Sequence, residues 1–167
     1  MRKLAAVPLA AVAACVLAAT AAAKLTAVEQ KWASPMISVW NQQNLGLHVV
    51  LQAASAKNAL VYGSANNKKL TIILNTFVLC GSSIKKAGAP PSPRLATFKT
   101  ALTAACTHDT AGANDFAKAV GAVRRGKSTQ ARSLLTQGVT AFKLGSTALT
   151  KAYRALIAVG GKNVFKA

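Results

Sequence analysis

Acidic side chains are almost missing from this chain, since its 167 residues contain only Glu29, Asp109 and Asp115 against 21 Lys and Arg. Three scattered carboxylates exclude most carboxylate-based catalysis and the oxygen cages that hold calcium or magnesium. The formal net charge is +18 at pH 7. Attraction to anions is therefore the main electrostatic property of the chain.

Aromatic residues are also scarce, at 5% of the sequence, and alanine is the most frequent residue. A core of small side chains suits closely approaching helices better than a sheet, because alanine has high helix propensity and low strand propensity. The length allows one domain, which argues against a multidomain enzyme.

The first 23 residues have the pattern of a secretory signal peptide. Arg2 and Lys3 precede an uncharged stretch over residues 4–23, which ends in an Ala-x-Ala site before Lys24. Cleavage after Ala23 would leave a single domain of residues 24–167 with a net charge of +16. We therefore expect export to the periplasm, the cell surface or the medium.

Two alternatives for this segment involve retention at a membrane. Twenty uncharged residues could form a helix of about 30 Å and span a bilayer, although Pro8 interrupts them. Val12–Cys15 also fits a permissive lipobox, in which Cys15 would be acylated. Either alternative would give a membrane-anchored or lipid-anchored structural protein of the cell envelope.

The remaining sequence predicts helices separated by short breaks. Thr26 and Glu29 form a capping box that opens a long helix reaching about Leu51, which Pro35 either kinks or restarts. A turn over 57–67 leads to a second helix over 68–86. The β-branched run 71–73 keeps a strand open as an alternative there.

The clearest break is the proline-rich stretch 87–93. It is followed by an apolar helical pattern over 94–108 and by a turn expected over 109–113. Asn114 or Asp115 would then cap a short helix carrying Phe116, Val120 and Val123.

The last helix, from Ser128 to about Ala158, has the strongest periodicity. Large residues alternate with small ones along one heptad stripe, which allows a partner helix to approach closely unless the heptad is accidental. The large residues are Leu135, Phe142, Leu149 and Leu156, and the small ones are Ala131, Gly138, Gly145 and Ala152. We therefore predict an all-α, up-and-down bundle of four to five helices.

Cys80 and Cys106 are the only cysteines after residue 23, and an oxidising compartment favours a disulfide between them. Closing a loop of this size would stabilise the fold by about 3.5 kcal/mol. A metal site of both cysteines with His108 is the alternative, but the spacing is a weak signal.

Residues 121–128 match the phosphate-binding pattern G-x-x-x-x-G-K-[ST]. That motif needs a buried strand before it and an acidic residue later in the chain, and the sequence supplies neither. We therefore interpret Gly126 as a helix terminator and Ser128 as the cap of the next helix.

Other catalytic signals are weak. No nucleophile elbow selects a serine, so an enzyme with an unrecognised His-centred site is only an alternative hypothesis. We expect His48 to be a packed residue of the first helix and His108 to lie at a helix end. Trp32 and Trp40 are expected to anchor the core. No metal or other cofactor is predicted.

Charge is thus the main functional signal. We predict a noncatalytic exported protein that binds a polyanionic envelope polymer, an anionic lipid surface or a protein partner, and that does not recognise nucleic-acid sequence. The cations could also serve only solubility. The candidate anion-binding residues are Lys68, Lys69, Lys85, Lys86, Arg124, Arg125, Lys127, Arg132, Lys143, Lys151 and Arg154.

Overall fold

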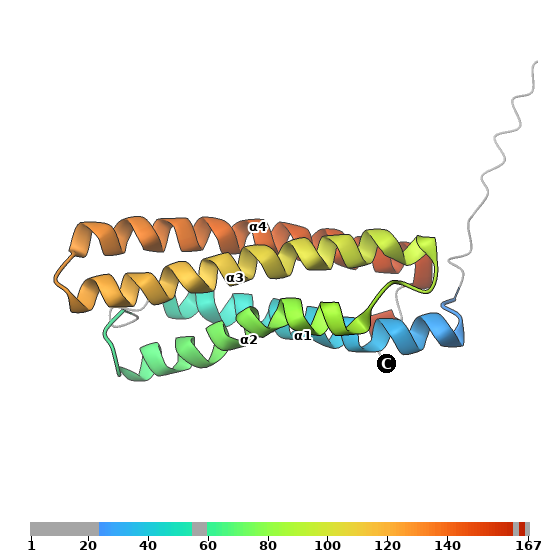
Figure 1. The fold of residues 1–167 in the computed structure, drawn as a ribbon, viewed down its shortest axis with the longest axis horizontal. Helices are drawn as coiled ribbons and strands as arrows, with labels where there is room; N and C mark the ends of the chain where they lie inside the picture. The colour runs from blue at the N-terminus through green and yellow to red at the C-terminus, as the bar shows by residue number, and fades with distance from the viewer. Residues whose placement is uncertain (1–23, 55–59, 162–163, 166–167) are drawn as a thin grey trace, which may run out of the picture.

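A computed structural model describes residues 24–54, 60–161 and 164–165, which form four long α-helices running up and down (Figure 1). The helices are α1 (Ala27–Ala54), α2 (Ala65–Ala87), α3 (Ala96–Arg124) and α4 (Ser128–Gly160), with a 3-10 helix η1 (Pro93–Leu95) before α3. The predicted all-helical fold is confirmed, and the strand alternative for 71–73 is wrong. The predicted signal peptide, including Cys15, lies outside the described residues.

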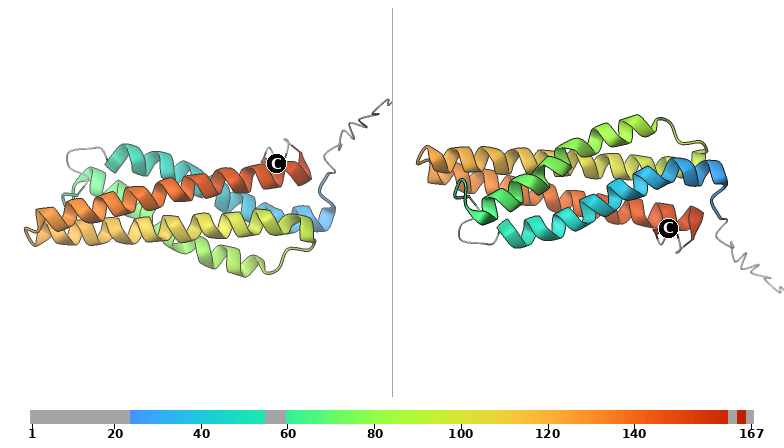
Figure 2. Two further views of the ribbon diagram at one scale, coloured as in Figure 1. Left: turned by 90° about the horizontal axis from the view of Figure 1, so that it is seen from above. Right: turned by 90° about the horizontal axis from the view of Figure 1, so that it is seen from below.

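The bundle is elongated, and its two ends differ in which connections they carry (Figures 1 and 2). The α3–α4 turn and the start of α2 lie at one end, called the turn end here. The α2–α3 connection lies at the other end with the start of α1 and the end of α4, and this is called the crossover end. The tightest helix pair is α3 with α4, and α2 crosses α3 obliquely (Figure 2).

Helix boundaries follow local signals in the sequence. The predicted capping box is present, because Thr26 N donates to Glu29 Oε2 at 2.8 Å and Glu29 N donates to Thr26 Oγ1 at 3.3 Å. Gly126, at φ +69°, follows the end of α3 as expected. The cap of α4 is Lys127, so the assignment of Ser128 as the cap is wrong by one residue. Helix α1 continues through the exposed Pro35.

Helix α3 is continuous across 109–113, where the sequence predicts a turn, so that prediction is wrong. The turn-forming residues there instead face other helices. Gly112 is buried against the Phe142 ring so closely that a Cβ would lie 2.8 Å from it. Asp109 and Ala113 are buried on the same helix. Packing against α4 therefore outweighs the local preference for a turn.

The heptad stripe of α4 packs as the sequence predicts. All of its large and small residues are buried except Leu135, which is half-buried. Phe142 lies against Gly112, and Phe116 of α3 lies against Gly138. Each ring thus fills the space left by a glycine on the opposite helix, which allows the two backbones to approach closely.

Aromatic side chains pack within and between the two helical hairpins, α1–α2 and α3–α4. The ring of Phe142 lies 5.4 Å from that of Phe77 and 5.6 Å from that of Phe116, measured between centroids. Trp32 Nε1 donates to the Ala87 carbonyl and Trp40 Nε1 to the Leu149 carbonyl, each at 2.9 Å. Both half-buried tryptophans therefore act as packing anchors, as predicted.

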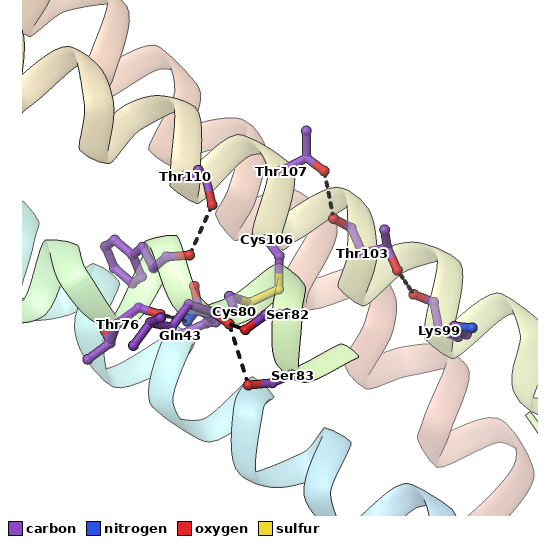
Figure 3. The surroundings of a disulfide bond; sticks show 12 residues. Gln43, Thr76, Cys80, Ser82, Ser83, Lys99, Thr103, Cys106, Thr107 and Thr110 are labelled. Carbon is purple, nitrogen blue, oxygen red and sulfur yellow. Dashed lines mark hydrogen bonds between the residues drawn. A yellow bond between two sulfur atoms is a disulfide. The ribbon is translucent and has the colours of Figure 1, made fainter. Parts of the chain in front are cut away.

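The half of the bundle nearer the crossover end, called the crossover half, contains a disulfide and an ion pair between helical segments. Cys80 of α2 and Cys106 of α3 form the predicted disulfide, with Cα atoms 5.5 Å apart (Figure 3). One turn away, Thr110 Oγ1 donates to the Phe77 carbonyl at 3.0 Å. At the end of the bundle, Arg94 pairs with the buried Glu29 of α1.

Candidate anion-binding site

Six of the eleven predicted anion-binding residues gather at the turn end. They come from the first turn of α2, the last residues of α3, the α3–α4 turn and the start of α4, and all are exposed. They are Lys68, Lys69, Arg124, Arg125, Lys127 and Arg132, and they are called the turn-end cluster. Exposed cations up to 64 positions apart in sequence are therefore brought to the same end of the bundle (Figure 1).

The other five residues do not join this cluster. Lys85 and Lys86 lie in the last turn of α2 and Lys151 and Arg154 near the end of α4, so these four belong to the crossover end. Lys143 lies near the middle of α4. From the sequence, these residues are expected in four local clusters, namely 68–69, 85–86, 124–127 and a stripe on the last helix. Sequence spacing alone does not show which of these clusters meet at one end of the bundle.

Carboxylates do little to neutralise the turn-end cluster. Asp115 accepts from Lys118 Nζ at 3.5 Å, and neither residue belongs to the cluster. Glu29 lies at the crossover end, where hydrogen bonds from Arg94, Ser92 and Thr26 hold the pKa of its carboxyl well below the ordinary value. Within the described part of the chain, no cation of the cluster has a carboxylate partner.

The third acid, Asp109, is fully buried in the α3–α4 interface. Neither of its carboxyl oxygens has a hydrogen-bond partner, and burial raises its pKa to about 8. A carboxyl group in this environment is mostly neutral at pH 7. It therefore contributes little negative charge to the surface.

One cation of the cluster is held in place by an aromatic ring. The guanidinium carbon of Arg124 lies 4.5 Å from the centroid of the exposed Tyr62 ring, which is within cation–π range. This contact joins the end of α3 to the segment before α2. Tyr62 could not be predicted from the sequence as part of this site, because it lies 62 positions from Arg124 and no local pattern connects the two residues.

The two histidines considered for catalysis lie in different surroundings from those that the sequence predicts. His48 is exposed on α1 and not packed, so the prediction for it is wrong. His108 lies in the interior of α3, because the helix does not end there, and that prediction is wrong as well. Residues 121–128 cover the last turn of α3, the turn and the first residue of α4, and the residues before them are helical.

Among residues 24–54, 60–161 and 164–165, no three His, Cys, Asp or Glu side chains are grouped to hold a metal ion. No helix within those same ranges has the length and hydropathy needed to cross a bilayer.

Comparison with known proteins found no matching family model, no similar curated protein and no similar solved structure.

Proposed function

We propose that the protein is exported and binds anionic polymers of the cell envelope without catalysis, with the turn-end cluster as its contact surface. The observation that supports this proposal is the placement of six exposed cations, from three helices and the α3–α4 turn, at one end of the bundle, with no carboxylate partner among the described residues. A polymer carrying phosphate or carboxylate groups can contact several such cations at once. Each contact releases counterions and adds to affinity.

A four-residue charge variant tests the site. Lys68, Lys69, Arg125 and Lys127 are replaced by glutamine, and binding to inorganic polyphosphate and to a polyuronate is measured over a range of salt concentrations. We expect affinity to fall at least tenfold at low salt. The slope of log affinity against log salt should become shallower by roughly 0.7 to 0.9 for each lost contact.

The crossover end supplies a control of equal net charge. Glutamine at Lys85, Lys86, Lys151 and Arg154 also removes four cations, and these residues are exposed. This control should retain the affinity and salt slope of the unchanged protein. Equal losses in the two variants would show that net charge alone drives binding, and the proposed site would then be wrong.

Two further measurements separate the alternatives. Vesicles of phosphatidylglycerol and phosphatidylcholine should bind less tightly than either polymer if the partner is a polymer. Stronger binding to the anionic vesicles would identify the lipid surface instead. Intact mass spectrometry of the protein from its own cells would test export, because signal-peptide cleavage should give the mass of a chain that begins at Lys24.

A further inference from the structure

A groove of about 350 Å³ lies between α2 and α3 in the turn half of the bundle. Leu70, Leu74 and Val78 line it from α2, at spacings of four residues, over roughly 12 Å of helix. The opposite wall, on α3, includes the small residues Ala113 and Ala117. Small side chains on α3 leave this space open where α2 crosses it, and the volume lies within the range of ligand sites.

The turn-end mouth of the groove carries a positioned cation. Arg124 and Tyr62 both line the groove, and the guanidinium lies over the Tyr62 ring. No carboxylate pairs with Arg124 in the described residues, so its N–H groups are available to an anion. An apolar floor with a cation at one end complements a molecule that has an alkyl body and an anionic head.

Polar groups along the walls fit such a ligand as well. The amides of Asn75 on α2 and Asn114 on α3 line the groove and are exposed, so they stay hydrated beside a bound alkyl chain. Tyr62 is 67% exposed and Val78 is 49% exposed, so apolar surface at both ends of the groove contacts water. Burying that surface under an alkyl chain is favourable.

We propose that this groove binds a single-chain anionic amphiphile of the fatty-acid class. The carboxylate would pair with Arg124, and the alkyl chain would lie along Leu70, Leu74 and Val120 toward Val78. This site shares Arg124 with the turn-end cluster but takes a different ligand, and its other lining residues lie outside the cluster. The two proposals are tested separately, because the four-residue polymer variant leaves Arg124 unchanged.

Calorimetric titration of the purified protein with decanoate, below the concentration at which decanoate forms micelles, tests the proposal. Saturable binding of one molecule per chain is expected. Decanol has the same chain without the charge and should bind about tenfold more weakly. Arg124→Gln should weaken decanoate about tenfold and leave decanol unchanged.

A groove-filling variant separates the groove from simple charge attraction. Ala117 is exposed and lines the groove, so Ala117→Phe fills the space without entering the core. It should abolish decanoate binding while circular dichroism and polyphosphate affinity stay unchanged. The matched control Ala111→Phe also replaces an exposed alanine of α3, but outside the groove, and should retain binding.

Three results would overturn the proposal. They are nonsaturable uptake of decanoate, equal affinity for decanoate and decanol, and full binding by Ala117→Phe. If polyphosphate binding fails while decanoate binding meets every expectation, only the proposed envelope function is wrong.

Discussion

The Asp109 carboxyl of α3 packs directly against Gly145 of α4 and fills the space that a side chain at position 145 would need. The glycine therefore does more than shorten the distance between two backbones. It accommodates a buried polar group that has no hydrogen-bond partner.

Gly145→Ala should destabilise the protein, because the added Cβ would overlap Asp109 Oδ1. We expect a loss of about 1 to 3 kcal/mol in the free energy of unfolding, measured by urea denaturation. Asp109→Ala in the same chain should recover part of that loss. Gly81 is the control, since it lies in α2 with open space around it, and Gly81→Ala should stabilise by about 0.5 to 1 kcal/mol.

Stability should fall as the pH rises from about 4 to about 8. Burial raises the pKa of Asp109 from the ordinary 3.8 to about 8, so the folded state binds a proton that the unfolded state releases in this window. The free energy of unfolding then decreases by up to roughly 1.4 kcal/mol per pH unit. Asp109→Asn should remove this slope, whereas the surface variant Asp115→Asn should retain it.

The Glu29 carboxylate should produce the opposite trend in acid. Its pKa is held well below the ordinary 4.5, chiefly by Arg94, so its stabilising contribution is present above about pH 4.5 and is lost as the pH falls further. Glu29→Gln should lower the melting temperature at pH 6 and flatten the acid limb of the profile. An unchanged acid limb would contradict this assignment. Thr26→Ala removes the hydrogen bond from Glu29 N to Thr26 Oγ1 at the start of α1 and should cost about 1 kcal/mol at pH 6.

Removing the disulfide should lower stability by about 3.5 kcal/mol, because 26 positions separate Cys80 and Cys106 along the chain. The double variant Cys80→Ala with Cys106→Ala tests this by chemical denaturation. A reducing agent should destabilise the unchanged protein by a similar amount and leave the variant unaffected. A stable variant with no loss would show that the crossover half needs no covalent link.

The parts of the fold that could be predicted depend on contacts within a few residues or on a long periodic stripe. The capping box at Thr26, the break before Pro93 and the large-and-small alternation of α4 are of this kind. The disulfide could be predicted because Cys80 and Cys106 are the only two cysteines after residue 23 and so allow a single pairing.

The failures arise where a distant partner reverses a local preference. Gly112 resembles a turn signal, yet it lies inside α3 because Phe142 occupies the space that a side chain would take. His48 is expected to be packed because it lies on an apolar helix, but its side chain is exposed. The α2–α3 groove depends on the angle at which two helices cross, and no stretch of sequence encodes that angle alone.

The disulfide and the Glu29–Arg94 pair both lie in the crossover half of the molecule. The α1–α2 pair is therefore linked to the α3–α4 pair more strongly at this end than at the turn end. Thermal separation of α2 from α3 should accordingly begin near Leu70 and stop at Cys80. Amide protons in the first turns of α2 should then exchange with solvent sooner than those beside the bridge. The groove lies in the half of the bundle that has neither of these links. Separation of α2 from α3 there would therefore admit a ligand while the rest of the bundle stays folded.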